Sequence, residues 1–122
     1  MTTNELKLRT KKFSILIIDL VEKLPNTIAG KTIANQIIRS GTSVGANYRA
    51  VCRARSDKEF ISKMYIVLEE ADETMFWLEL IIERKWFDEN EILRLLDEGN
   101  QLTAIFVSSL KTVNARISNA KI

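Results

Sequence analysis

The stretch Ser56–Ile82, SDKEFISKMYIVLEEADETMFWLELII, decides the fold class. Apolar and small side chains recur in it in alternating steps of four and three residues, and the repeat comprises Phe60, Met64, Val67, Ala71, Thr74, Leu78 and Ile81. This heptad spacing is typical of an α-helix that packs nearly parallel to its neighbours. Ser56 and Glu59 have the spacing of a capping box, which predicts that the helix begins there.

Helical patterns also lie on both sides of this stretch. Upstream, a first helix is predicted to begin near Asn4, a good N-cap residue, and to stop at Pro25 and Asn26. Downstream, Asp88 is the expected N-cap of a last helix, whose apolar residues recur every three or four positions. Fraying of this last helix is expected beyond Arg116.

A second helix is predicted to open at Thr27 or Thr32 and to run to about Ala54. It contains Gly41 and Gly45, each of which costs about 1 kcal/mol in a helix interior relative to alanine. This cost is tolerable where two helices approach closely, and the neighbouring residues are small enough to allow such an approach. The less favoured alternative is a helix break at Gly41.

Four helices joined by short connections predict an antiparallel, up-and-down four-helix bundle, with residues 1–122 forming a single domain. Four glycines and one proline favour long helices over turn-rich β structure. The only cysteine, Cys52, excludes an intramolecular disulfide, indicates a reducing compartment and is expected to act as a small buried hydrophobe. Residues 1–12 are polar and charged, unlike a secretory signal, and no apolar run approaches the roughly 20 residues of a membrane span. A cytoplasmic location without membrane insertion is therefore expected.

Histidine is absent from the chain, which removes the commonest general base and the commonest metal ligand. The remaining cue for a metal is a run of acids that comprises Glu69, Glu70, Asp72, Glu73, Glu79 and Glu83. Di-iron helical bundles pair such acids with Glu-x-x-His motifs, which cannot exist here. The acids are better explained as a solvated face or as the partner of a basic surface. We therefore expect no enzymatic activity, no metal and no cofactor.

Charge is divided unevenly along the chain. Residues 1–63 hold twelve Lys or Arg and five acids, whereas residues 64–122 hold six Lys or Arg and eleven acids. Winding residues 31–53 at 100° per residue places most cations of this segment on one face, opposite an apolar arc. With three cations near the following turn they form the predicted nucleic-acid-binding surface, which comprises Lys31, Arg39, Arg49, Arg53, Arg55, Lys58 and Lys63. Such a row can neutralise several phosphates. The alternative is that these cations only solvate an outer helix face.

Aromatic and large apolar side chains surround the helix almost completely near Met75–Ile82. One face of a monomeric bundle cannot bury all of them, so a subunit interface is predicted here, and its residues are Met75, Phe76, Trp77 and Leu80. Tyr48 lies at a position that favours the core or an interface over stacking on a base.

Three segments together resemble the bacterial four-helix-bundle family of 23S rRNA intervening-sequence proteins, also described as S23 ribosomal protein-like. They are QIIRSGTSVGAN at 36–47, SDKEF at 56–60, and the spacing Glu70-x-x-Glu73-x-x-x-Trp77-Leu78. The most specific part joins Arg39, Ser40, Ser43 and Asn47 to the two glutamates. In contrast to many relatives, which carry acids after the asparagine, this chain continues with Tyr48-Arg49-Ala50.

The resemblance implies an antiparallel four-helix bundle that assembles into a ring-like homo-oligomer, a pentamer. It also implies kinship with the accessory variability proteins of diversity-generating retroelements, which bind nucleic acid and a reverse transcriptase through a basic surface. From the residues themselves, Ser40, Ser43 and Asn47 flank the apolar arc, where small polar groups can bridge helices. The motif is therefore interpreted as mainly structural, with Arg39 at the boundary between structure and function.

Two functional hypotheses follow from the sequence. The first is a non-enzymatic oligomer that binds RNA or DNA through the basic surface as an accessory protein. The second is a protein-binding scaffold without a nucleic-acid role, in which the basic and acidic halves pair between subunits and the exposed surface recruits a partner.

Overall fold

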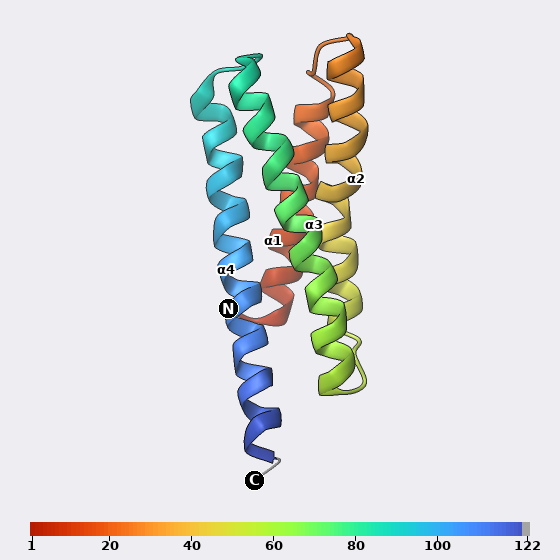
Figure 1. Cartoon of the computed structure of the whole chain (residues 1–122), viewed down its shortest axis with the longest axis vertical. Helices are drawn as coiled ribbons and strands as arrows, with labels where there is room; N and C mark the ends of the chain where they lie inside the picture. The colour runs from red at the N-terminus through yellow and green to blue at the C-terminus, as the bar shows by residue number, and fades with distance from the viewer. Residues whose placement is uncertain (121–122) are drawn as a thin grey trace.

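The computed structural model describes residues 1–120 and contains four helices: α1 (Thr3–Val21), α2 (Ile28–Val51), α3 (Asp57–Arg84) and α4 (Glu89–Ala120). No strand occurs among these residues, so the prediction of an all-α chain with four helices is confirmed. Figure 1 shows that consecutive helices run in alternating directions along one long axis.

Neighbours in the chain are also neighbours in space, because α2 packs against both α1 and α3, and α3 packs against α4. The contact between α1 and α4 is looser. Two ion pairs cross it: Arg9 Nη2 lies 2.6 Å from Glu98 Oε1, and Lys23 Nζ lies 3.4 Å from Glu91 Oε1. Hydrogen bonding to Glu98 is the main cause that raises the pKa of Arg9. These ion pairs supplement the apolar contacts that α1 and α4 make in the common core.

The heptad seam of α3 forms the centre of the core, as predicted. Met64, Val67, Leu78 and Ile81 are at most 1% exposed, and Ala71 and Thr74 are also buried. They pack with the inward faces of the other helices, where the largest fully buried side chains are Phe13 and Phe106.

Close approach of α1 and α2 explains the glycines in the second helix. A Cβ at position 41 would lie 2.9 Å from both Cγ1 and Cγ2 of Ile17, and one at position 45 would lie 3.3 Å from the Thr10 carbonyl oxygen. The Ser14 hydroxyl donates a hydrogen bond to the Gly41 carbonyl across this contact, at 3.2 Å. Helix α2 is continuous through both glycines, so the alternative of a break at Gly41 is wrong.

Three of the helix starts were expected at or near the observed residues. Thr27 caps α2, and Ser56 caps α3 by accepting a hydrogen bond from the backbone N–H of Glu59 at 3.1 Å. In return, the Glu59 carboxylate accepts from the N–H of Arg55, one residue before the cap. Helix α4 begins at Glu89, directly after the expected Asp88.

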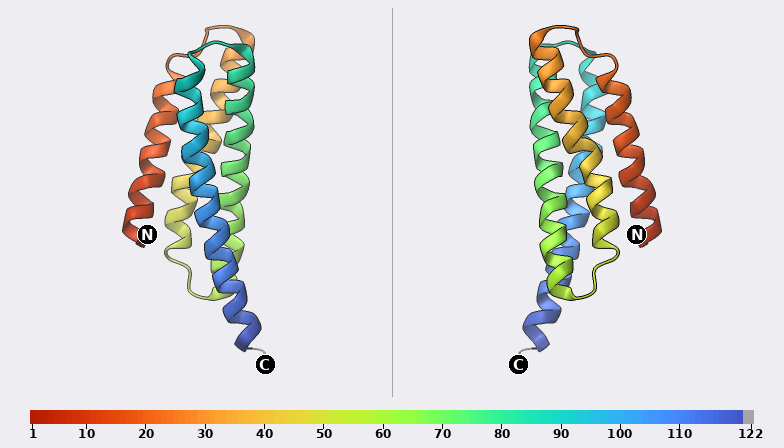
Figure 2. Two further views of the ribbon diagram at one scale, coloured as in Figure 1. Left: turned by 90° about the vertical axis from the view of Figure 1, so that its left-hand side faces the viewer. Right: turned by 90° about the vertical axis from the view of Figure 1, so that its right-hand side faces the viewer.

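Two predicted helix ends need correction. Helix α1 is capped by Thr2 instead of Asn4, because the Thr2 hydroxyl accepts from the N–H of Glu5 and the Glu5 carboxylate accepts from the N–H of Thr2. Helix α4 does not fray at Arg116 but continues to Ala120, and its last turns extend past the other helices (Figure 2). The Arg116 side chain binds Asp57 at the start of α3, which ties this part of α4 to the bundle.

Candidate nucleic-acid interface

Three of the predicted cations meet on the outer face of α2 and α3. Arg49, Arg53 and Lys63 line one open surface depression together with the small residues Ala46 and Ala50. We refer to Arg49, Arg53 and Lys63 as the basic cluster. The first two lie one helical turn apart, about 6 Å along α2. Lys63 comes from the neighbouring helix, so the cluster is a property of the packed α2/α3 pair.

The charges of the basic cluster are only partly neutralised. Lys63 Nζ lies 3.3 Å from Glu59 Oε1, four residues away on the same helix. Arg49 and Arg53 are exposed and form no ion pair within residues 1–120. A guanidinium without a carboxylate partner keeps its five N–H donors free for phosphate oxygens. The basic cluster therefore presents two unpaired guanidinium groups beside the ammonium group of Lys63.

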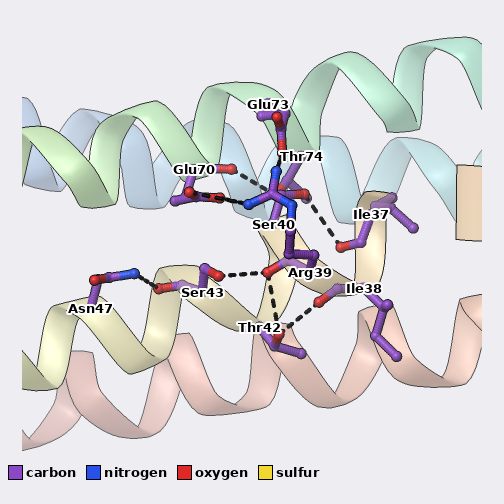
Figure 3. Close-up of polar contacts among 10 residues, drawn as sticks. All are labelled: Ile37, Ile38, Arg39, Ser40, Thr42, Ser43, Asn47, Glu70, Glu73 and Thr74. Carbon is purple, nitrogen blue, oxygen red and sulfur yellow. Dashed lines mark hydrogen bonds and ion pairs between the residues drawn. The ribbon is translucent and has the colours of Figure 1, made fainter. Parts of the chain in front are cut away.

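Arg39, in contrast, is engaged within the bundle (Figure 3). Its Nη1 lies 3.1 Å from Glu70 Oε2, and its Nη2 contacts Glu73 Oε2, so that two glutamates of α3 share one guanidinium of α2. Both carboxylates are half-buried, whereas Arg39 is exposed. The motif arginine thus acts as a clamp between α2 and α3, and its charge is compensated.

The small polar residues of the same motif fall into two classes (Figure 3). Ser40 bridges the helices, because its hydroxyl lies 2.9 Å from that of Thr74 in the buried α2/α3 contact. Ser43 and Asn47 do not bridge them, since Ser43 donates to the Arg39 carbonyl and Asn47 donates to the Ser43 carbonyl within α2. The prediction that all three bridge helices is therefore correct only for Ser40.

The other predicted cations do not join the basic cluster. Lys31 lies in the first turn of α2, 18 residues and therefore about 27 Å from Arg49. Arg55 lies in the α2/α3 turn and lines a separate depression with Tyr48, Cys52 and other residues. Lys58 is exposed in the first turn of α3. Arg55 and Lys58 add positive charge to the α2/α3 end of the molecule, whereas Lys31 lies near the opposite end of α2.

Sequence reasoning missed Arg116, which reaches this same end from α4. Its Nη2 lies 2.7 Å from Asp57 Oδ1, and this hydrogen bond is the main cause that lowers the pKa of Asp57. The residues are 59 positions apart, so no local pattern could have paired them. Asp57 is thereby neutralised and does not weaken the field of the neighbouring cations.

Tyr48 is in the core, as expected, and is not available for stacking on a base. It is 6% exposed, and its ring stacks on Phe106 with centroids 5.8 Å apart. Burial raises the pKa of its hydroxyl above the ordinary value. Cys52, expected to be buried, is only half-buried.

The predicted subunit-interface residues separate into inward and outward positions. Met75 is a correction: it is 8% exposed and its sulfur lies against Gly99 of α4, so it belongs to the monomer core. Phe76 is 50% exposed, and its ring meets that of Trp77 edge to face at 5.1 Å. Trp77 and Leu80 are half-buried. Phe76 thus remains the main exposed apolar side chain of the predicted interface.

Within residues 1–120, the acidic side chains do not gather into a group able to hold a metal ion. No helix in that range is long and apolar enough to cross a membrane.

Residues 3–108 match the model of the family described as 23S rRNA-intervening sequence protein. The chain belongs to this family. No curated protein matches the chain. A crystal structure of a protein of unknown function from the S23 ribosomal protein family of Bacteroides thetaiotaomicron is similar, with 33% sequence identity and a TM-score of 0.81. The similarity covers 87% of this chain and 98% of that chain.

The match to the 23S rRNA-intervening sequence family covers the first three helices and most of α4. It includes the Arg39 clamp, the Ser40–Thr74 bridge and the basic cluster, whereas Arg116 lies beyond it. Membership in the family places these features within a shared fold, and the similar crystal structure leaves their function open, because that protein is itself described as having unknown function.

Proposed function

We propose that this member of the 23S rRNA-intervening sequence family is a non-enzymatic accessory protein of the cytoplasm that binds RNA or DNA. The observation that carries the proposal is the basic cluster, in which Arg49 and Arg53 have no carboxylate partner within residues 1–120 and lie beside Lys63 around an open depression. Nearby, Arg55 and Lys58 extend the positive surface. Contacts of this kind bind phosphates without reading sequence.

A ring-like homo-oligomer of antiparallel bundles, a pentamer, is part of the proposal. One copy offers only a few unpaired cations, and a modest field becomes strong when several copies present their clusters together. The exposed Phe76 supports an apolar contact between copies or with a partner. Kinship with the accessory variability proteins of diversity-generating retroelements makes a reverse transcriptase one proposed protein partner.

The first experiment is a salt titration of binding to structured RNA, single-stranded DNA and duplex DNA, on protein whose oligomeric mass is determined in the same buffer. The double variant Arg49→Gln/Arg53→Gln is compared with Lys11→Gln/Lys12→Gln, which removes two exposed charges of α1. The first variant should lower the slope of log affinity against log salt by about 2 per bound subunit, and the second should not. Binding that is absent, or independent of salt, contradicts the proposal.

The second candidate is a protein scaffold without a nucleic-acid role. The observation that favours it is that basic and acidic side chains lie on different parts of the surface, so the basic cluster of one copy can face acidic side chains of another copy. The charge-reversed variant Arg49→Glu/Arg53→Glu distinguishes the candidates. The scaffold requires that this variant lose its oligomeric state, whereas nucleic-acid binding requires an intact oligomer that no longer binds.

A further inference from the structure

A second groove lies on the other flank of α3, between α3 and α4. Its walls carry three exposed acids, Asp72 and Glu79 from α3 and Asp97 from α4. Two of them lie seven residues apart on one helix, which spaces them about 10 Å along the groove. We refer to this feature as the acidic groove.

Apolar side chains line the acidic groove between these acids. Met75 is buried and Leu96 is half-buried, whereas Leu93 is 44% exposed. Gly99 of α4 lies behind the Met75 side chain, because a Cβ at position 99 would overlap the Met75 sulfur. Without that Cβ, the Met75 side chain settles against α4. The result is an apolar floor with one large side chain, Leu93, still open to a partner.

The acids of this groove are not held in ion pairs within residues 1–120, and a nearby cation is Arg9, whose pKa is raised mainly by Glu98 and in small part by attraction to Asp97. The residues that line the groove include no Lys or Arg. Several acids elsewhere on the bundle are paired, as Glu70 and Glu73 are by Arg39 and as Glu98 is by Arg9. The groove therefore combines carboxylates that form no ion pair among the described residues with exposed apolar surface.

We infer that the acidic groove binds a cationic amphipathic helix of a partner protein. Leucine-like side chains of that helix pack on Leu93 and Leu96, and its Lys or Arg side chains pair with Asp72, Glu79 and Asp97. This is the recognition of an amphipathic helix in a groove, with charge complementarity that fixes its orientation. Nucleic acid does not suit the groove, since phosphates are repelled by its carboxylates.

A second copy of the chain is a poorer occupant than a separate helix. The basic cluster would have to enter the groove, but the surface between its cations is made of Ala46 and Ala50. These methyl groups offer little area to cover the exposed Leu93. The inference thus concerns a face and a ligand class different from those of the nucleic-acid proposal, and either can fail without the other.

The probe is an 18-residue, fluorescein-labelled peptide of leucine and lysine with its leucines on one helical face. A peptide of the same composition, with leucines spread around the helix, controls for charge alone. At about 0.15 M salt, where exposed charges more than about 8 Å apart are largely screened, fluorescence anisotropy should show tighter binding of the amphipathic peptide by about tenfold. Equal binding of the two peptides overturns the inference.

Matched variants locate the site. Asp72→Asn/Glu79→Gln/Asp97→Asn should weaken binding by about tenfold, whereas the control Glu5→Gln/Asp19→Asn/Glu22→Gln, at exposed positions of α1 and its C-cap, should change it less than about threefold. Leu93→Ala keeps all charges and should weaken binding several-fold through lost apolar area. Equal losses in both triple variants, or no effect of Leu93→Ala, contradict the site.

Sedimentation of the variants without peptide measures their oligomeric mass and so tests whether a second copy of the chain occupies the groove. The oligomeric mass of Asp72→Asn/Glu79→Gln/Asp97→Asn should equal that of the wild type. Dissociation of this variant alone would assign the groove to a second copy and overturn the inference. Nucleic-acid binding by the same variant should be retained, which separates this test from that of the basic cluster.

Discussion

The hydroxyl groups of Ser40 and Thr74 lie 2.9 Å apart in the fully buried contact between α2 and α3. The Ser40 hydroxyl donates to the Ile37 carbonyl and accepts from Thr74, so that each buried oxygen has a partner. On the surface above this pair, Arg39 joins Glu70 and Glu73. Ser40 and Arg39 thus align α2 with α3 through one buried and one exposed contact, and in the packed pair Lys63 lies beside Arg49 and Arg53.

Removal of the Thr74 hydroxyl should destabilise the protein by about 1 kcal/mol. Thr74→Val keeps the side-chain volume, so the loss reports the hydrogen bonds of this hydroxyl to Ser40 and to the Glu70 carbonyl. Removing both hydroxyls in Ser40→Ala/Thr74→Val should cost less than the sum of the single changes, because each single change already breaks the one hydrogen bond between them. Urea unfolding of the four proteins measures this coupling, and strictly additive losses would contradict it.

Two glycine substitutions should have different effects. Gly41→Ala places a Cβ 2.9 Å from the stiff, buried Ile17, and we expect a loss of about 1–3 kcal/mol from overpacking that exceeds the gain of about 1 kcal/mol in helix propensity. Gly99→Ala meets only the flexible end of Met75, so gain and loss should nearly cancel. Thermal unfolding of both variants checks the order. A Gly41→Ala protein as stable as the wild type would show that α1 and α2 can separate at no cost.

Much of the fold follows from local sequence patterns. The heptad spacing in Ser56–Ile82 identifies every buried residue of α3 except Met75, since a continuous helix with a period near 3.5 leaves few alternatives, and it adds Phe60, which is half-buried. The small residues around Gly41 indicate close packing in the same way. The errors concern helix ends, where the outcome depends on one side chain: Thr2 replaces Asn4 as a cap because Glu5 completes its capping box.

The candidate site is less accessible to sequence reasoning. Helical winding places Arg39 and Arg49 on the same face of α2. It does not show that Glu70 and Glu73 of α3 lie opposite Arg39, whereas Arg49 has no carboxylate partner among the described residues. The prediction for Met75 failed for a similar reason. Its side chain fills the space beside Gly99, and Gly99 lies on α4, so the pattern of α3 alone does not show that Met75 is buried in the core. Pairings between distant segments, including that of Arg116 with Asp57, require the packed structure.

The different environments of Arg39 and Arg49 lead to opposite expectations for their variants. Arg39→Gln should lower the free energy of unfolding by up to about 1 kcal/mol, since the clamp is partly exposed, and should leave the salt dependence of nucleic-acid binding unchanged. Arg49→Gln should leave stability unchanged and lower the salt slope by about 1. Chemical unfolding and filter binding on the same preparations make the comparison. A reduced salt slope for Arg39→Gln would contradict this expectation and show that Arg39 contacts the nucleic acid.

Acid should weaken the link between α4 and α3 through Asp57. Arg116 holds the pKa of Asp57 below its ordinary value, so the link stabilises the fold above the unfolded pKa of about 3.9 and is lost as pH falls through the lower, folded pKa. The difference in Tm between wild type and Arg116→Gln should therefore be constant above about pH 5 and should shrink as the pH falls through the lowered pKa of folded Asp57. Hydrogen bonding by the Arg55 backbone and Lys63 also lowers the pKa of Glu59, but that contribution is common to both proteins and cancels in the difference. A Tm difference that persists unchanged at the lowest pH would mean that Arg116 stabilises α4 by packing and not through the Asp57 carboxylate.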